Sequence, residues 1–498
     1  MSRFLYFFVL SASIRAAEAP DAMAIFKTGD YARALPALRQ SVAKTPNDAV
    51  LQAALLSTLV YLGHVDEAAD AADNDADNFP QSPDVLAARG EFAYYMGDMP
   101  QAETLFRAAL KLRDPTARAV YGLSRIHRAA SNFKTARLLC LTAHQADPDD
   151  ALITLAFTRY LMGQKRREFL PDFMKEHPWF YPRLQNMEET GAELRDELEG
   201  RKSFELDGSR EETTIPLFFV HDGPRVVAMG IYLTIEGGKR LNLILDTGAT
   251  GILLSQAAID RAGLKHLGST QVGGAGDNGL RNAFFAVAET CTIGNLKYKT
   301  CVFGATEGKK RVTDAEDGLF GTDFFSDYLI TIDFQRRMLH LVPLPQRDPN
   351  PQGYDRSPLP SEQGFTPVFR FGHRLDVSTK VNGKSTGLFL IDTGSQVSFV
   401  DSTFARLTTK IRGNEYMHVH GVSGTVKDVF EADKAELQFA RFRQSNLGLT
   451  AINLNNEPWH QEVRTGGVLG FPLLTLFRLT LDYRNGLVNF DYVLDHKK

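Results

Sequence analysis

Two apolar stretches, one at the middle of the chain and one further on, are each interrupted by the same tripeptide. Leu241–Ser255 and Gly387–Asp401 each read as an apolar run, Asp-Thr-Gly and a second apolar run. Apolar runs of this length around a glycine turn are typical of buried strands. The pattern therefore places Asp246 and Asp392 at the tips of two strand pairs, where a carboxylate is costly unless something pairs with it. We expect the two carboxylates to meet.

The residues that follow each tripeptide repeat as well. A Gly-apolar-apolar-Gly segment ends at Gly321, 75 positions after Asp246, and another ends at Gly470, 78 positions after Asp392. Each segment precedes an apolar strand that ends in aspartate, at offsets of 87 and 90 positions. Both offsets differ by the same three residues, which indicates a duplicated domain with one small loop change before the glycine.

The first third of the chain has a helical pattern instead, and it repeats. The segments Gly29–Ala34, Gly63–Ala68, Gly97–Ala102 and Ser131–Ala136 begin 34 residues apart. A 34-residue helix–turn–helix period is the tetratricopeptide signature. We predict about four repeats over 21–165, stacked into a solenoid whose concave surface typically holds protein partners. The alternative is a packing module whose groove is filled by the chain itself.

Other boundaries follow from local composition. Residues 1–20 combine an early arginine, an apolar run and small residues, which predicts a secretory signal and an exported, periplasmic or secreted protein. Charged residues and prolines in 166–212 predict a capping and connecting helical segment. Strand-rich sequence over 213–345 and 365–498 predicts two lobes, joined by a Pro-rich linker over 346–364.

Composition narrows the possible partners. The 498 residues are 43% hydrophobic and 23% charged, an ordinary globular composition with room for several domains. The formal net charge of −4 gives no reason to expect nucleic acid as a partner. After signal removal, we see no apolar run long enough to span a membrane.

Cys291 and Cys301 flank a predicted hairpin turn, and either a disulfide or two buried thiols fits them.

The paired motifs resemble those of aspartic proteases, and more closely the retropepsin-like branch common among bacterial exported proteins. The resemblance covers roughly residue 213 to the C-terminus. It implies a mostly-β bilobal acid-protease fold of two duplicated lobes, placed after an all-α tetratricopeptide solenoid. It makes Asp246 and Asp392 the catalytic pair, one from each lobe. Supporting positions in the two active loops would be Thr247, Gly248, Thr393, Gly394 and Ser395.

The resemblance also implies roles for other residues. Thr247 and Thr393 would hydrogen-bond across the lobes and lock the two loops together. Two glycine-rich hairpins would act as mobile flaps that close on an extended peptide. Their glycines are Gly273, Gly274 and Gly276 in the first lobe and Gly421 and Gly424 in the second.

The resemblance further implies a mechanism, since aspartic proteases are the standard example of two carboxyl groups that share one proton. The ionised member activates a water that attacks the peptide carbonyl, and the protonated member donates to the carbonyl oxygen. No metal and no cofactor is expected.

Because Ser395 stands where the first loop has Ala249, its hydroxyl could donate to Asp392. We therefore predict Asp392 as the base and Asp246 as the acid.

The sequence thus predicts an aspartic endopeptidase whose substrate is a peptide or protein and whose solenoid can hold a protein partner. Three alternatives stay open. The chain could be a binding scaffold with a protease-like region that does not cleave, it could be active only as an intermolecular dimer, or it could process only itself.

Overall fold

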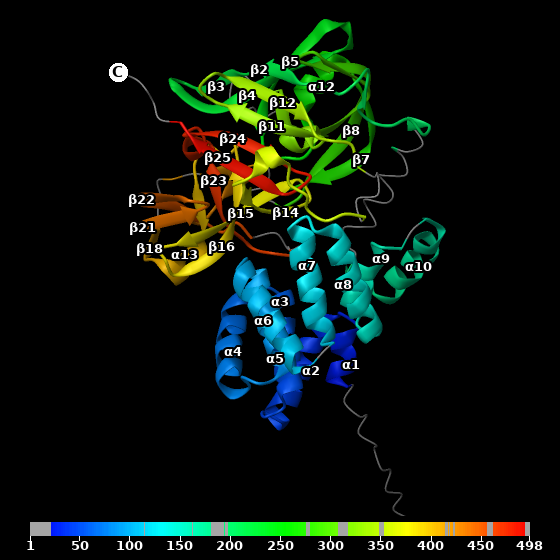
Figure 1. Cartoon of the computed structure of the whole chain (residues 1–498), viewed down its shortest axis with the longest axis vertical. Helices are drawn as coiled ribbons and strands as arrows, with labels where there is room; N and C mark the ends of the chain where they lie inside the picture. The colour runs from blue at the N-terminus through cyan, green and yellow to red at the C-terminus, as the bar shows by residue number, and fades with distance from the viewer. Residues whose placement is uncertain are drawn as a thin grey trace, which may run out of the picture.

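The computed structural model describes residues 21–493 except 114, 162, 181–193, 195–197, 275–278, 307–316, 348–352, 414–416, 418, 422–423 and 456–461. The predicted signal, 1–20, lies outside the described residues. No helix in the described part of the chain is long and apolar enough to cross a membrane. A helical solenoid occupies one end of the molecule, and two strand-rich lobes occupy the rest (Figure 1). The predicted fold class is confirmed.

The solenoid is built of helices that pack against their neighbours along the chain. Its inner turns fall at Gly29, Gly63 and Gly97, with φ of 79°, 73° and 82°, a left-handed conformation that suits glycine. Ser131 takes the fourth equivalent place with φ of 61°. The alanines at the repeat spacing, Ala34, Ala68, Ala102 and Ala136, are all buried and let the helices approach closely. The helices are α1 (Ala22–Lys27), α2 (Tyr31–Lys44), α3 (Ala49–Tyr61), α4 (Val65–Asn78), α5 (Pro83–Tyr95), α6 (Met99–Leu112), α7 (Ala117–Ala129), α8 (Phe133–Ala146), α9 (Ala151–Thr158) and α10 (Gly163–Glu176).

The segment after α9 turns back onto the first repeat. In η1 (Pro178–Phe180), the indole N–H of Trp179 donates to the carbonyl oxygen of Thr28 at 3.1 Å. The ring of Phe180 lies so close to Gly29 that a Cβ there would be 2.2 Å from it. Phe173 of α10 packs against α9. The start of the predicted connecting segment therefore joins the first and last parts of the solenoid.

The first lobe is a sheet that closes on itself. Strands β4, β5, β10, β6, β9 and β8 pair in that order, and β8 pairs back with β4. Strand β1 joins this sheet, so the sheet begins before residue 213. The elements are β1 (Glu205–Leu206), β2 (Thr213–Pro216), β3 (Phe218–Asp222), β4 (Arg225–Ile235), β5 (Lys239–Asp246), β6 (Ile252–Ser255), α12 (Gln256–Ala262), β7 (Lys265–Val272), β8 (Arg281–Ile293), β9 (Leu296–Thr306), β10 (Gly318–Gly321), η3 (Thr322–Phe325), β11 (Tyr328–Asp333) and β12 (Met338–Pro343).

The second lobe repeats this arrangement. Strands β15, β16, β23, β17, β22 and β21 pair in that order, and β21 pairs back with β15. The elements are β13 (Thr366–Pro367), β14 (Phe369–Phe371), β15 (Arg374–Val381), β16 (Ser385–Asp392), β17 (Phe399–Asp401), α13 (Ser402–Thr408), β18 (Ile411–Gly413), β19 (Val419–Gly421), β20 (Gly424–Val426), β21 (Val429–Phe439), β22 (Phe442–Ile452), β23 (Thr465–Gly470), α14 (Phe471–Leu474), β24 (Phe477–Asp482) and β25 (Leu487–Tyr492).

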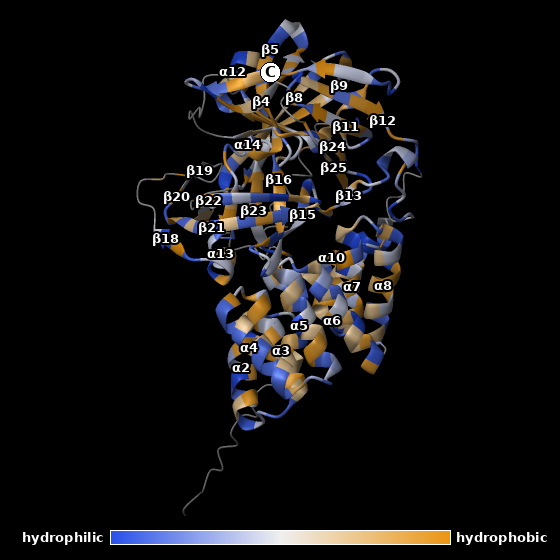
Figure 2. Cartoon of the chain, turned by 60° about the vertical axis from the view of Figure 1, so that its left-hand side comes forward, coloured by the Kyte–Doolittle hydropathy of each residue, from blue (hydrophilic) through white to orange (hydrophobic). Residues whose placement is uncertain are grey.

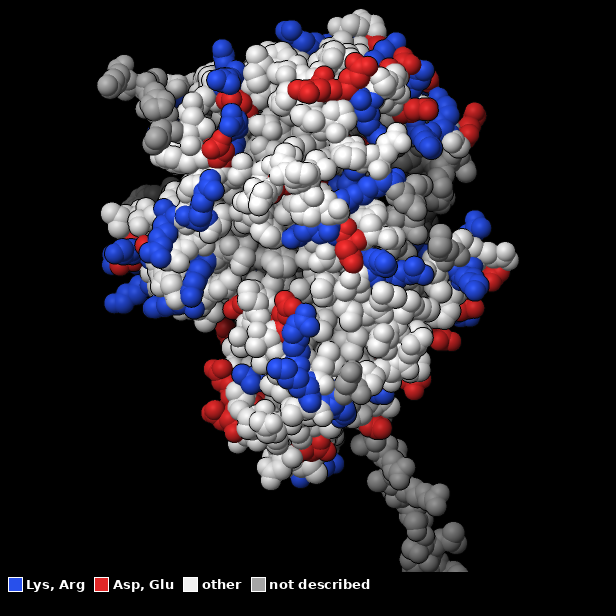
Figure 3. All heavy atoms as spheres, viewed as in Figure 1, with Lys and Arg blue, Asp and Glu red and all other residues white. Residues whose placement is uncertain are grey.

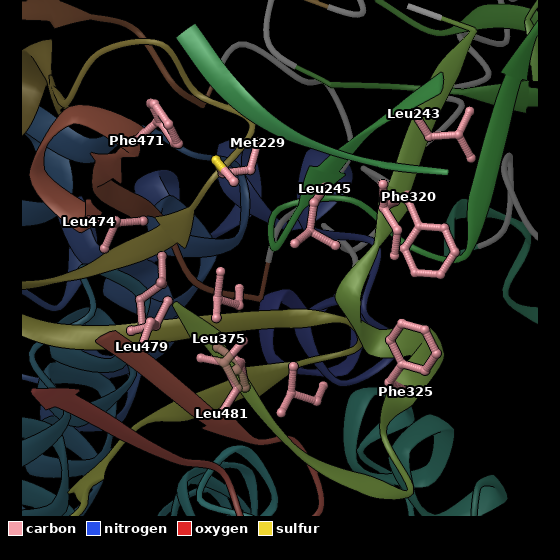
Figure 4. Close-up of a cluster of buried hydrophobic side chains, with 14 of the residues drawn as sticks. Met229, Leu243, Leu245, Phe320, Phe325, Leu375, Phe471, Leu474, Leu479 and Leu481 are labelled. Atoms are coloured by element: carbon pink, nitrogen blue, oxygen red, sulfur yellow. The ribbon is translucent and has the colours of Figure 1, made fainter. Parts of the chain in front are cut away.

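A shared sheet joins the lobes. Its order is β13-β25-β24-β11-β12-β2, so each lobe supplies the same series of strands from opposite sides. At the centre, Thr331 lies opposite Thr480, and their hydroxyls are 3.1 Å apart. Hydrophobic residues recur along the strands of both lobes (Figure 2). Side chains from the two lobes form one buried cluster, which includes Leu245, Phe320, Leu375, Leu479 and Leu481 (Figure 4).

Cysteine pairing and surface charge complete the description. Cys291 and Cys301 form a disulfide across the β8–β9 hairpin, with Cα atoms 6.2 Å apart, which decides between the two alternatives left open by the sequence. Lys and Arg gather over the side of the second lobe that carries β18, β21 and β22 (Figure 3). Asp and Glu gather along the edge of the solenoid formed by α4 (Figure 3).

Candidate active site

Each Asp-Thr-Gly loop begins where a buried strand ends. Strand β5 ends at Asp246 and β16 ends at Asp392. A parallel neighbour runs beside each strand, so that Gly321 lies opposite Asp246 and Gly470 opposite Asp392. The apolar runs form these strands because their side chains are buried on both faces. The two copies therefore present their aspartates in the same way.

The two aspartates meet at the contact between the lobes. A Cβ at Gly394 would lie 2.5 Å from Cγ of Asp246, and a Cβ at Gly248 would lie 2.8 Å from Cγ of Asp392. Real Cβ atoms do not approach other atoms this closely, so each loop needs glycine after its threonine. Each lobe thus packs its glycine against the aspartate of the other lobe.

The threonines connect the loops by reciprocal hydrogen bonds. The Thr247 hydroxyl donates to the carbonyl oxygen of Ile391 at 2.6 Å and accepts from the Thr393 amide at 3.0 Å. The Thr393 hydroxyl donates to the carbonyl oxygen of Leu245 at 2.7 Å and accepts from the Thr247 amide at 3.1 Å. Both threonines are buried. Breaking a buried hydrogen bond leaves its donor and acceptor without partners and costs their full desolvation energy. These bonds therefore hold the two loops in one register.

The electrostatic surroundings of the two carboxyl groups are similar but not equal. Burial, followed by the charge of Asp392, raises the pKa of Asp246 well above its usual value. Burial also raises the pKa of Asp392, whereas a hydrogen bond from Asp246 and the amides of Gly394 and Ser395 lower it. The two carboxyl groups thus interact directly and titrate as one pair.

The reason that the sequence suggested for this asymmetry is wrong. The hydroxyl of Ser395 donates to the carbonyl oxygen of Val397 at 2.9 Å rather than to Asp392. The backbone N–H of Ser395 donates to Asp392 instead, at 3.0 Å, together with that of Gly394 at 2.9 Å. On the other side, the Gly248 amide donates to Asp246 at 2.7 Å. Main-chain amides therefore lower the pKa of both carboxyl groups, those of Gly248 and Ala249 for Asp246 and those of Gly394 and Ser395 for Asp392, so they do not account for the asymmetry.

The flap glycines lie in or beside hairpins. Gly273 and Gly274 follow β7, which pairs with β8, and Gly276 lies outside the described residues. In the second lobe Gly421 lies opposite Gly424 at the end of the β19–β20 hairpin. A hairpin thus stands at each predicted flap position.

Further residues contact the loops or one another close to the site, and the Asp-Thr-Gly motifs gave no sign of them. His373, in the turn between β14 and β15, has its Nε2 3.1 Å from the carbonyl oxygen of Gly248. Burial lowers the pKa of His373, which favours the neutral ring. Arg374 lowers the pKa of Asp392 by its charge. Tyr483 and Thr322, the residue after Gly321, have hydroxyls 2.6 Å apart. These contacts join residues far apart in the chain, so local patterns could not reveal them.

Two neighbouring carboxyl groups that hold one proton between them can take a proton from water on one side and give one to a carbonyl oxygen on the other. Comparison with known proteins identifies the domain that carries the first of them. Residues 231–324, from β4 to η3, match the aspartyl protease family model, and residues 87–151 match a tetratricopeptide repeat model. No curated protein matches the chain. The chain therefore carries an aspartyl protease domain and tetratricopeptide repeats.

Proposed function

We propose that this chain, with its aspartyl protease domain after tetratricopeptide repeats, is an aspartic endopeptidase. Asp392 is the base that takes a proton from the attacking water. Asp246 is the acid that donates its proton to the carbonyl oxygen of the scissile peptide bond. The water oxygen bonds to the carbonyl carbon and gives a tetrahedral diol. The C–N bond then breaks as Asp392 gives the proton it took from water to the amine nitrogen and Asp246 takes a proton back from a hydroxyl of the diol, which leaves a carboxylic acid and an amine. The hairpins β7–β8 and β19–β20 are the flaps that cover the substrate peptide.

One observation carries the proposal. The carboxyl groups of Asp246 and Asp392 come from duplicated loops and meet at the contact between the lobes, with Asp246 buried, Asp392 half-buried and two interlocked threonines beside them. A protein that uses its lobes only to bind peptides has no need of two raised carboxyl pKa values at one point. Perturbed titratable pairs of this kind cluster at functional sites.

The test is cleavage of a denatured protein by the purified full chain and its variants. Asp246→Asn or Asp392→Asn alone is expected to lower kcat by roughly a thousandfold or more, because each removes one half of a unit that works together. Asp260→Asn, an exposed aspartate on α12, is the matched control and is expected to leave kcat unchanged. Cleavage that survives in both active-loop variants would refute the proposal and favour a binding scaffold.

We further propose that the protein is exported. The disulfide between Cys291 and Cys301 supports this, because disulfides persist in oxidising compartments. The expected result in fractionated cells is oxidised protein outside the cytoplasm. A chain found in the cytoplasm with both thiols reduced would contradict the proposal.

A further inference from the structure

The solenoid contacts the second lobe near the starts of β16, which ends at Asp392, and of β23, its parallel neighbour. On β16, Leu388 packs into the buried cluster formed by α5, α6 and α7. A Cβ at Gly97, in the turn between α5 and α6, would lie 2.8 Å from the Leu388 amide nitrogen. Just before β23, the Arg464 amide donates to the carbonyl oxygen of Tyr95 at 2.7 Å. Both strands therefore start against the solenoid.

A group of arginines on the solenoid holds one acidic residue at this contact. Arg128 and Arg159 donate to the two carboxylate oxygens of Glu462, at 2.7 and 3.2 Å. Arg125 donates to the backbone carbonyl oxygen of the same residue at 3.0 Å, while its guanidinium lies 4.0 Å from the centre of the Tyr94 ring. Charge-assisted hydrogen bonds of this kind are about twice as strong as neutral ones.

The charge of Glu462 fits this site. Partial burial of Glu462, whose side chain is 35% exposed, opposes the ionised form, but Arg128, Arg159 and Arg125 outweigh that effect and lower the pKa of Glu462. The hollow that remains among these arginines measures about 10 Å³. That volume is about one water molecule, so no further ligand fits while Glu462 is in place.

A chain of contacts leads from Glu462 to the Asp392 loop. The side chain of Arg464 donates to buried Asp401, the last residue of β17, at 3.2 Å. Strand β23 then runs from Thr465 along β16 until Gly470 lies opposite Asp392. The amide of Gly470 donates to Ser398 at 3.0 Å, and that of the next residue donates to the carbonyl oxygen of Ser395 at 2.8 Å.

The first lobe anchors the equivalent strand within itself. Asp317 precedes β10 and accepts from the amide of Asn242 on β5 at 2.9 Å. It also forms an ion pair with Arg261 of α12. In the second lobe, Arg464 and Thr465 at the start of β23 are likewise held within the lobe, by Asp401 and Asn455, but Glu462, three residues before β23, is held by arginines of the solenoid.

We propose that the ligand of the solenoid's arginine cluster is the chain's own second lobe, and that Glu462 is the positioning residue through which the solenoid holds the Asp392 loop. The solenoid is then part of the active enzyme rather than a separate adaptor. The positioning part rests on the proposed peptidase function. The docking part does not depend on it.

Hydrogen exchange of the full-length protein tests the docking part without any substrate. Glu462→Gln is expected to speed amide exchange in β16 and β23 by about tenfold, because opening of these strands becomes easier. Exchange in β5 and β10 of the first lobe should not change. The control is Asp491→Asn, which removes an exposed ion pair with Arg478 in the same lobe and should leave all four strands unchanged. Equal exchange of β16 and β23 in wild type and Glu462→Gln would overturn the inference.

Kinetics tests the positioning part. Glu462→Gln is expected to lower kcat by about tenfold with little change in KM, since the carboxyl pair is misplaced while the substrate groove is kept. The charge-swapped variant Arg128→Glu with Glu462→Arg should recover part of both the exchange protection and kcat. If the single variant does not fold, the charge-swapped variant is compared with the wild type in its place. Unchanged kcat alongside faster exchange would refute positioning but keep docking. If the wild type shows no cleavage that Asp246→Asn removes, the peptidase function is refuted. The hydrogen-exchange result would then still decide whether the second lobe docks on the solenoid.

Discussion

At the scale of single residues, the glycine of each Asp-Thr-Gly loop has no room for a side chain, so its identity is constrained as tightly as that of the aspartate. Gly394→Ala would bring a Cβ to 2.5 Å from Cγ of Asp246, so one of the two loops must move. Misplacement of reacting groups by about 1 Å can cost about a hundredfold in rate, and we expect a loss of kcat/KM of at least that size. The measurement is peptide cleavage alongside circular dichroism.

Gly413→Ala is the matched control for this substitution. Gly413 lies in the same lobe, its φ is not left-handed, and a Cβ there would meet no atom within 4 Å. We expect Gly413→Ala to keep full activity. Equal activity of both variants would show that the space around Asp246 is not tight.

The titration of the carboxyl pair predicts the pH range of activity. Both aspartates have pKa values above the ordinary 3.8, and that of Asp246 is raised the more. Activity requires one proton on the pair, so it should appear as pH rises through the lower macroscopic pKa and disappear as pH rises through the higher. The basic limb of the pH profile of kcat/KM is expected to lie well above pH 3.8, because burial and the charge of Asp392 hold the proton on the pair. A basic limb near or below that value would contradict the raised pKa.

A second buried carboxylate predicts a pH-dependent stability. Burial raises the pKa of Asp75, on α4, to about 6. An unfolded aspartate titrates near 3.9, so keeping Asp75 ionised in the folded protein lowers the free energy of unfolding. This loss is absent below about pH 4 and complete above about pH 6. Asp75→Asn is therefore expected to stabilise the protein by about 1–2 kcal/mol at pH 7.5 and hardly at all at pH 4.

Denaturant unfolding at the two pH values measures this difference. Asp73→Asn, on an exposed position of the same helix, removes the same charge without relieving burial. It should have little effect at either pH. A gain of the same size in both variants would assign the effect to the overall charge of the acidic helix instead.

At the scale of elements, the strand pairs and helical repeats could be predicted because their information is local. The apolar runs around Asp246 and Asp392 specify buried strands, and the 34-residue spacing specifies the helix pairs. The direction of the Ser395 hydroxyl could not be predicted, since the nearby carbonyl of Val397 competes for it. The contacts of His373 and Glu462 depend on how whole elements dock, and no local pattern encodes that.

The shared sheet is the element on which the meeting of the lobes depends. Leu479 lies in β24, opposite Ile332 of β11, and is fully buried. Leu479→Ala is expected to lower the free energy of unfolding by about 2–5 kcal/mol, because it leaves a cavity in a packed core. Leu476→Ala, at a side chain that is 44% exposed, should change it by less than about 0.5 kcal/mol. Comparable losses in the two variants would place the core elsewhere.

At the scale of the whole molecule, one chain supplies both halves of the carboxyl pair. The second lobe lies between the first lobe and the solenoid, and both lobes share the sheet that contains β11 and β24 (Figure 1). An equimolar mixture of the Asp246→Asn and Asp392→Asn variants is therefore expected to stay as inactive as either alone. Exchange of lobes between chains would restore one intact pair and produce activity in the mixture. Light scattering of the active wild-type fraction should give the mass of a single chain, whereas activity confined to a dimer fraction would show that the pair forms between chains.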